Sequence, residues 1–151
     1  MKTPEEQLEI DLNEHIEKLH HSNFEVQKLT ADQIIKIIDD YKYEKRYNPD
    51  LVFSLACRSF GFEPIDRKAV TRKRRVVEAR QVAMYYFKKV ANHDLALARI
   101  GGFFGKDHAT VLHAIRTVKN LLETDIVFKT YYEIFLEETK KHSMYLCQDI
   151  T

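Results

Sequence analysis

Residues 101–113 hold the side chains of this sequence that are best suited to binding a nucleic acid. Three glycines lie within residues 101–105, and residues 106–113 then supply an ammonium group, a carboxylate, a hydroxyl and two imidazoles. Groups of these kinds donate to phosphates or read the donors and acceptors on base edges. A run of basic residues from Arg72 to Arg75 lies upstream and adds cations that favour the same polyanion.

These polar groups need a helix that presents them to one side. Asp107 can cap such a helix, and apolar residues follow at 111, 112, 115, 118 and 122. A short helix is expected to begin at Asp94, and the chain is expected to turn at Gly101 and Gly102, because adjacent glycines weaken a helix. Two short helices joined by a glycine-containing turn are typical of the helix-turn-helix, whose second helix enters the DNA major groove.

Positive charge is concentrated in the middle of the chain. The whole sequence has a net charge of +1, but residues 51–119 contain 14 Lys or Arg against 5 Asp or Glu, a net of +9. Residues 1–50 contain 7 basic and 12 acidic residues, and residues 120–151 contain 3 and 6. A single basic run is more often a solvated surface, but a basic centre between acidic ends indicates a nucleic-acid site.

Helical periodicity accounts for the rest of the chain, and no strand pattern of any length appears. Capping boxes begin helices at Thr3 and Thr30. Asn48-Pro49 begins a third helix, which a glycine at position 61 ends. We therefore expect an all-α protein, with further helices over 67–70, 76–91 and 125–141.

Three motifs of this central region resemble the C-terminal DNA-binding domain of the bacterial replication initiator DnaA. The stretch from Ile100 to Ala114, IGGFFGKDHATVLHA, resembles the signature of that domain. The stretch from Arg72 to Tyr85, RKRRVVEARQVAMY, is similar to its basic loop and long helix, and FGFEP at 60–64 is similar to the turn after its first helix. The resemblance covers residues 50–136. It implies a helix-turn-helix bundle of the DnaA C-terminal, Trp-repressor-like type, here with two extra N-terminal helices.

The resemblance also implies which residues contact DNA. Arg72 falls where the family's basic-loop arginine enters the minor groove, whose narrow A·T-rich form attracts arginine. Asp107, His108 and Ala109 fall where the family reads bases in the major groove. DNA contacts are also implied for Lys73 and Arg74 of the basic run. Lys106, Thr110 and His113 suit phosphates or nearby base edges, and Arg80, Gln81 and Lys88 fall on the family's backbone-contact side.

The sequence departs from this family at several positions. Ala109 replaces the more usual threonine or serine, which removes a hydroxyl contact. The usual proline before Ile100 is absent, the segment from Asn92 to Ile100 is longer, and the turn before Asp107 is shorter. No GxxxxGK[ST] phosphate loop is present, so we expect this sequence to lack the initiator's ATPase module.

Other kinds of chemistry are disfavoured. No nucleophile–base pair can be identified, so we expect no enzyme and no cofactor. His108 and His113 are five residues apart, which does not place them on one helix face, so we expect no metal. Cys57 and Cys147 form no disulfide framework, and no apolar run approaches the length of a membrane span. A cytoplasmic, nucleoid-associated protein without membrane contact is expected.

Three functions remain open. The first is sequence-specific binding of double-stranded DNA, at boxes like those of the initiator, in replication initiation or its regulation. The second is a transcriptional regulator that uses the same domain on other operators, and the third is an interaction protein that has lost DNA binding. We expect a monomer with an acidic helical extension at 1–48, a DNA-binding domain at 49–141 and a tail at 142–151. The extension is either a structural cap or a surface for replication proteins, including the full-length initiator.

Overall fold

Every regular element of the protein is helical over the residues that the computed structural model describes, 2–21 and 30–143. The expected all-α class is therefore confirmed. The chain divides into two compact units, Met1–Lys42 and Tyr43–Thr151. Over the described residues, no helix is long and apolar enough to cross a membrane.

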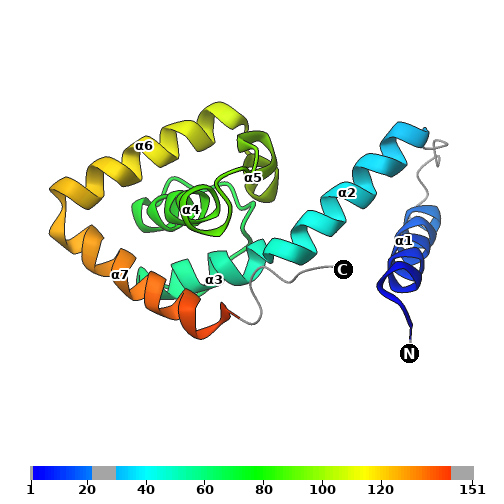
Figure 1. Ribbon diagram of the computed structural model, residues 1–151, viewed down its shortest axis with the longest axis horizontal. Helices are drawn as coiled ribbons and strands as arrows, with labels where there is room; N and C mark the ends of the chain where they lie inside the picture. Colours follow the sequence, from blue (N-terminus) through cyan, green and yellow to red (C-terminus); the bar gives the residue numbers. More distant parts are fainter. Residues whose placement is uncertain (1, 22–29, 144–151) are drawn as a thin grey trace. The chain divides into compact units, whose positions relative to one another are not determined.

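The first unit contains α1 (Pro4–His21) and most of α2 (Ala31–Tyr47) (Figure 1). Both predicted capping boxes are present. The backbone N–H of Glu6 donates to the Thr3 hydroxyl at 3.2 Å, and the Thr3 N–H donates to the Glu6 carboxylate at 3.1 Å. Thr30 and Gln33 make the same reciprocal pair. The orphan amides of both helix starts are thus satisfied by side chains close in sequence.

The second unit surrounds a central helix. Figure 1 shows α4 enclosed by the other helices of this unit, and α4 packs mainly against α3 and α6. α5 packs on α6, and α7 packs on both α3 and α6. The elements in order are α3 (Pro49–Ser59), α4 (Arg74–Tyr86), the π-helix η1 (Phe87–Ala91), α5 (Leu97–Phe104), α6 (His108–Thr124) and α7 (Ile126–Lys141).

Aromatic side chains hold these helices together. The ring of Phe87 is fully buried, and its centroid lies 5.2 Å from that of Phe103 and 6.2 Å from that of Phe104. Phe104 in turn meets Phe53 edge-on at 6.0 Å. Because these rings come from three different elements, the cluster joins α3, η1 and α5 into one core. Edge-to-face pairs add to the stabilisation from area burial.

The start and end of α3 follow the sequence signals. The Asn48 side chain accepts a hydrogen bond from the Leu51 N–H at 3.3 Å, and Pro49 occupies the first helical turn. At the other end Gly61 has a φ of 88°. The Gly61 N–H then donates to the Arg58 carbonyl and the Phe62 N–H to the Cys57 carbonyl, which is a Schellman motif.

The predicted turn at Gly101 and Gly102 is wrong. Both glycines lie inside α5, which continues to Phe104, and the chain turns at Gly105 with a φ of 65°. Asp94 does not cap this helix either, because α5 begins at Leu97 and its N-cap position is Ala96. Tertiary packing of the apolar α5 face has overridden the low helix propensity of the two glycines.

Two other helix predictions need correction. The residues at 67–70 form a single turn, in which the Asp66 carboxylate accepts from the Lys68 N–H at 2.8 Å. The helix expected over 76–91 begins at Arg74, and its last turn widens into η1. Each residue of a π-turn rotates less about the axis than in an α-helix, so Val90 leaves the buried face and is 49% exposed. Leu112 of α6 was also expected inside and is 37% exposed, with Ala114 buried instead.

Candidate nucleic-acid interface

The first turn of α6 is fixed by its own cap. The Asp107 carboxylate accepts the Thr110 backbone N–H at 2.8 Å and the Thr110 hydroxyl at 2.6 Å. These hydrogen bonds, the hydroxyl one first, hold the pKa of Asp107 below its usual range. The predicted N-cap is therefore confirmed, and it leaves His108 and Ala109 exposed at the helix start.

Opposite faces of α6 separate apolar from polar side chains. Val111 and Val118 are fully buried and Ile115 is nearly so, as the sequence pattern predicted. The exposed positions include 107–110, 113, 116 and 119, so a carboxylate, two imidazoles and two basic side chains share the solvent side. The free amides and the dipole of the helix N-terminus favour an anion at the same end.

The turn before α6 brings two backbone segments into direct contact. The Lys106 N–H donates to the Gly101 carbonyl at 2.9 Å, which closes the C-terminus of α5. A Cβ atom on Gly101 would lie 2.3 Å from the carbonyl oxygen of Lys106. Only glycine therefore fits at this point, and its absence of a side chain sets how closely α6 follows α5.

Three contacts fix the loop between α3 and α4, residues 60–73, which we call the basic loop. Arg67 donates through Nε to the Phe103 carbonyl of α5 at 2.6 Å. The Lys68 side chain runs beside the α5–α6 turn, where a Cβ on Gly105 would lie 3.7 Å from it. Arg80 of α4 donates to the Ala69 carbonyl at 2.5 Å. The loop is thus tied to the helix-turn-helix by side chains from the loop itself and from α4.

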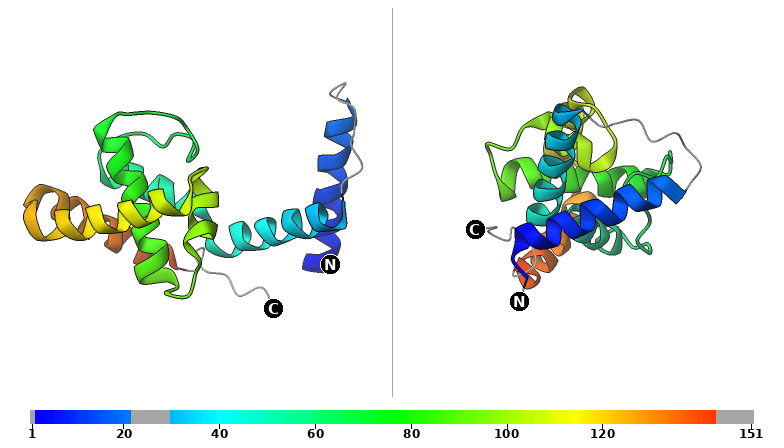
Figure 2. Two further views of the ribbon diagram at one scale, coloured as in Figure 1. Left: turned by 90° about the horizontal axis from the view of Figure 1, so that it is seen from above. Right: turned by 90° about the vertical axis from the view of Figure 1, so that its right-hand side faces the viewer.

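The far end of the basic loop reaches the other end of α6. Arg74 lies close enough to Asp125, the N-cap of α7, to interact with it electrostatically, and the Arg75 guanidinium lies 5.0 Å from the centre of the Tyr131 ring of α7. The left view of Figure 2 shows the loop passing along α6 from the α5–α6 turn toward the α6–α7 corner. Arg74 and Arg75, at the start of α4, therefore lie near the C-terminal end of α6.

The residues expected to contact DNA fall into two groups by exposure. Gln81, Lys88 and Lys106 are half-buried, and the Lys88 ammonium donates to the Leu95 carbonyl at 2.9 Å. Arg80 is buried. The remaining side chains are exposed, and these are Arg72, Lys73, Arg74, Asp107, His108, Ala109, Thr110 and His113.

Arg80 does not lie at the surface, as a phosphate-contacting residue would, and this corrects the expectation. Its relative exposure is 5%, and its guanidinium lies 5.9 Å from the centre of the Phe53 ring. Burial lowers the pKa of Arg80, and no hydrogen-bond partner for its Nε lies among the described residues. Its bond to the Ala69 carbonyl instead makes it a support of the basic loop.

Two residues that shape this surface, Arg67 and Glu78, were not predicted from the sequence. Arg67 bridges the Glu44 carboxylate at 2.8 Å and the Asp50 carboxylate, so it ties the loop to the end of α2 and the start of α3. Glu78 binds two arginines of the basic run. Residue type alone gives no signal for these roles, because a loop arginine and a helix glutamate are ordinarily solvated.

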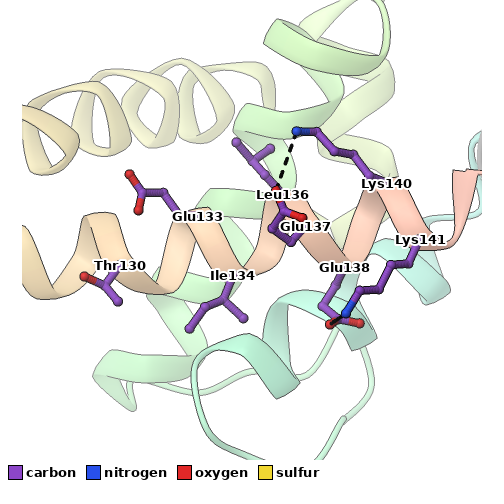
Figure 3. A pocket seen from close by; sticks show the side chains of 8 residues that line it. All are labelled: Thr130, Glu133, Ile134, Leu136, Glu137, Glu138, Lys140 and Lys141. Atoms are coloured by element: carbon purple, nitrogen blue, oxygen red, sulfur yellow. Dashed lines mark hydrogen bonds and ion pairs between the residues drawn. The ribbon is translucent and has the colours of Figure 1, made fainter.

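A hollow on α7 lies outside this surface. The hollow in Figure 3 is lined only by side chains of α7, in which Lys140 pairs with Glu137 and Lys141 with Glu138. Both lysines of its lining are thus paired with glutamates. Within the described residues, no group of three His, Cys, Asp or Glu side chains is placed to hold a metal ion.

Replacing Asp107 tests the cap. Asp107→Ala should lower the melting temperature at about pH 7. Because the folded-state pKa of Asp107 is lowered, its carboxylate stabilises the fold above the ordinary aspartate range, and this contribution is lost as the pH falls through the folded-state value. The melting temperatures of the two proteins should therefore converge as the pH falls below the ordinary aspartate range. Asp107→Asn keeps an acceptor for the Thr110 N–H, so at neutral pH its melting temperature should lie between those of the wild type and Asp107→Ala. A difference in melting temperature between wild type and Asp107→Ala that did not change with pH would contradict the role of the ionised Asp107 in the cap.

The chain is similar to known proteins over most of its described length. Residues 49–118 match the family described as the bacterial dnaA protein helix-turn-helix. Against the chromosomal replication initiator protein DnaA of Bacteroides thetaiotaomicron, the identity is 37% over 124 residues, 82% of this chain and 22% of that protein. The DnaA proteins of Bacteroides fragilis and Flavobacterium psychrophilum are 42% identical over 96 residues and 32% identical over 121 residues. These matches cover 63% and 78% of this chain but 20% and 25% of those proteins.

Proposed function

We propose that the chain binds duplex DNA sequence-specifically through α6 and the basic loop. The premise is that it belongs, through residues 49–118, to the bacterial DnaA helix-turn-helix family. The helix-turn-helix is a class of DNA-binding domain. The carrying observation is that the exposed first turn of α6 and the basic loop belong to one compact unit, in which Arg67 and Lys68 of the loop lie against α5 and the α5–α6 turn. In this proposal α6 enters the major groove and the basic loop follows the backbone toward the adjacent minor groove.

Each exposed residue has a role that its chemistry supports. His108 and Ala109 meet base edges, since an imidazole donates or accepts and a methyl group fits against the thymine methyl. Asp107 keeps one carboxylate oxygen on Thr110 and presents the other to a base amine. Arg72 enters an A·T-rich minor groove, where the negative potential is enhanced.

The biological setting is part of the same proposal. The chain spans about a fifth to a quarter of the length of the curated relatives that it matches, which are initiators of chromosomal replication by name. We place the protein in replication initiation or its regulation, acting on sites like the initiator's boxes.

Equilibrium binding to two duplexes tests the proposal. Fluorescence anisotropy would compare an initiator-type box with a scrambled duplex of the same composition, each at two salt concentrations. A preference for the box of about 1,000-fold or more is expected, which lies in the usual range of specific over non-specific binding. Equal, steeply salt-dependent affinities would leave a sequence-independent DNA binder, and absence of binding at low salt would refute the proposal.

Arg72→Ala tests the minor-groove contact. We expect a loss of about 1–3 kcal/mol of binding free energy on a box flanked by A·T pairs, and a smaller loss when those pairs are replaced by G·C. Lys140→Ala is the matched control, because it removes the same charge from an exposed side chain of α7. An equal loss of binding free energy on both duplexes would indicate that Arg72 contacts only phosphates.

A further inference from the structure

A buried carboxylate lies directly behind the exposed arginines of the basic run. Glu78 is in the second turn of α4 and its relative exposure is 6%. One of its oxygens accepts from the Arg74 Nε at 2.8 Å, and the other accepts from an Arg75 terminal nitrogen at 3.0 Å. Both oxygens of Glu78 are therefore occupied by guanidinium groups.

The two arginines differ in how far this pairing restrains them. The Arg74 side chain is 75% exposed, yet the edge of its guanidinium that carries Nε faces Glu78. The Arg75 side chain is 45% exposed and is held additionally over the Tyr131 ring. Each guanidinium thus lies at the surface with its charge already partly compensated from below. The raised pKa of Arg74, which its hydrogen bond to Glu78 causes, agrees with this geometry.

Such an arrangement has a direct consequence for a polyanion. A phosphate gains most from a cation that has no carboxylate beside it, because the carboxylate repels the phosphate and competes for the same N–H donors. Of the four basic residues from 72 to 75, Arg74 and Arg75 have such a carboxylate beside them. Arg72 and Lys73 are exposed, and no ion pair with a described residue is seen for either.

We propose that Glu78 limits sequence-independent DNA binding by withholding Arg74 and Arg75 from the phosphates. This inference rests on the proposed DNA-binding function and assigns to the interface a residue that does not itself touch DNA. It also revises the expected phosphate contact of Arg74. Binding then depends on Arg72 and Lys73, the two cations of the run that Glu78 does not pair with, and a scrambled duplex receives less of the general electrostatic attraction.

Glu78→Gln is the most direct test, because the amide keeps the shape and one acceptor while removing the charge. Each phosphate newly neutralised on duplex DNA steepens the slope of log affinity against log salt by about 0.9. We expect the slope on the scrambled duplex to steepen by about 1 to 2 and the affinity at low salt to rise roughly tenfold. Glu133→Gln on α7 makes the same change of net charge at an exposed position and should have a clearly smaller effect.

A second pair of variants separates release of the arginine from a change in net charge. In the Glu78→Gln background, Arg74→Gln should reverse a large part of the gain. In the wild-type background, Arg74→Gln should reduce the slope of log affinity against log salt less than Arg72→Ala does. This comparison does not need the Glu78→Gln protein, so it can be made even if that variant fails to fold. An equal reduction by both arginine variants would overturn the proposal.

The remaining outcomes distinguish this inference from the proposed function. A folded Glu78→Gln protein with an unchanged salt slope, or with weaker binding, would overturn the inference while leaving box recognition intact. Weaker binding would show instead that Glu78 positions the arginines for contact. Loss of the preference for the box over the scrambled duplex in the wild-type protein would refute sequence-specific recognition alone, and absence of any binding would refute both.

Discussion

Gly101→Ala is expected to destroy the helix-turn-helix, although it adds only one methyl group. The new Cβ would lie 2.3 Å from the Lys106 carbonyl oxygen and 3.2 Å from the Asp107 carbonyl carbon, and both are backbone atoms that cannot move independently of α6. Relief therefore requires α5 and α6 to separate, which also breaks the hydrogen bond from the Lys106 N–H to the Gly101 carbonyl. We expect a loss of about 3 kcal/mol or more, at the upper end for overpacking, and a loss of DNA binding.

The neighbouring glycine provides the control for this prediction. A Cβ on Gly102 would meet no atom within 4 Å, and Gly102 lies in the same helix. Gly102→Ala should therefore be neutral or stabilise the protein by about 0.5–1 kcal/mol through helix propensity. Urea unfolding of both variants measures the difference. Equal stabilities of Gly101→Ala and Gly102→Ala would show that α5 and α6 can move apart at little cost in free energy, contrary to this prediction.

Tyr47→Ala is expected to cost about 3–5 kcal/mol, as truncations of buried aromatic residues do. The residue is 2% exposed, and its ring centroid lies 6.2 Å from that of Phe87 and 6.3 Å from that of Phe103. Its hydroxyl accepts a hydrogen bond from the Asn92 side chain at 2.9 Å. The position precedes the matched segment 49–118, so a large effect would show that the folded core begins before that segment.

The conservative variant separates packing from hydrogen bonding. Tyr47→Phe retains the ring contacts and loses only the acceptor for Asn92, so it should cost about 1 kcal/mol. Both variants can be compared by denaturant midpoints with unchanged slopes. If Tyr47→Ala fell within 1 kcal/mol of the wild type, Tyr47 would not belong to the core that its burial defines.

Local signals in the sequence predicted local structure well. The capping boxes at Thr3 and Thr30 and the N-cap at Asp107 are all present, because each depends on a side chain and an amide within three residues. The buried faces of α6 and α7 also follow their periodicity, with the exception of Leu112. The residues of the candidate site on α6 are exposed for the same reason, since they occupy the opposite side of that periodicity.

Features that depend on distant parts of the chain were not predictable. Gly101 and Gly102 are helical because α5 packs on α6 and the turn is made by Gly105. Arg80 is buried because the Ala69 carbonyl and the Phe53 ring, both distant in sequence, surround it. An arginine that supports a loop and an arginine that binds a phosphate have the same sequence signature, so only the fold distinguishes them.

The π-turn at the end of the central helix bears on the ancestry of this protein. A turn closed from Phe87 to Asn92 contains one residue more than the α-helical turn that could replace it. An alignment with relatives that retain a regular helix should therefore open a one-residue gap here rather than in the loop that follows. Deleting the half-exposed Val90 is expected to restore regular winding while leaving Phe87 in the core, so we expect the fold to tolerate a length change of one residue here without rebuilding its interior.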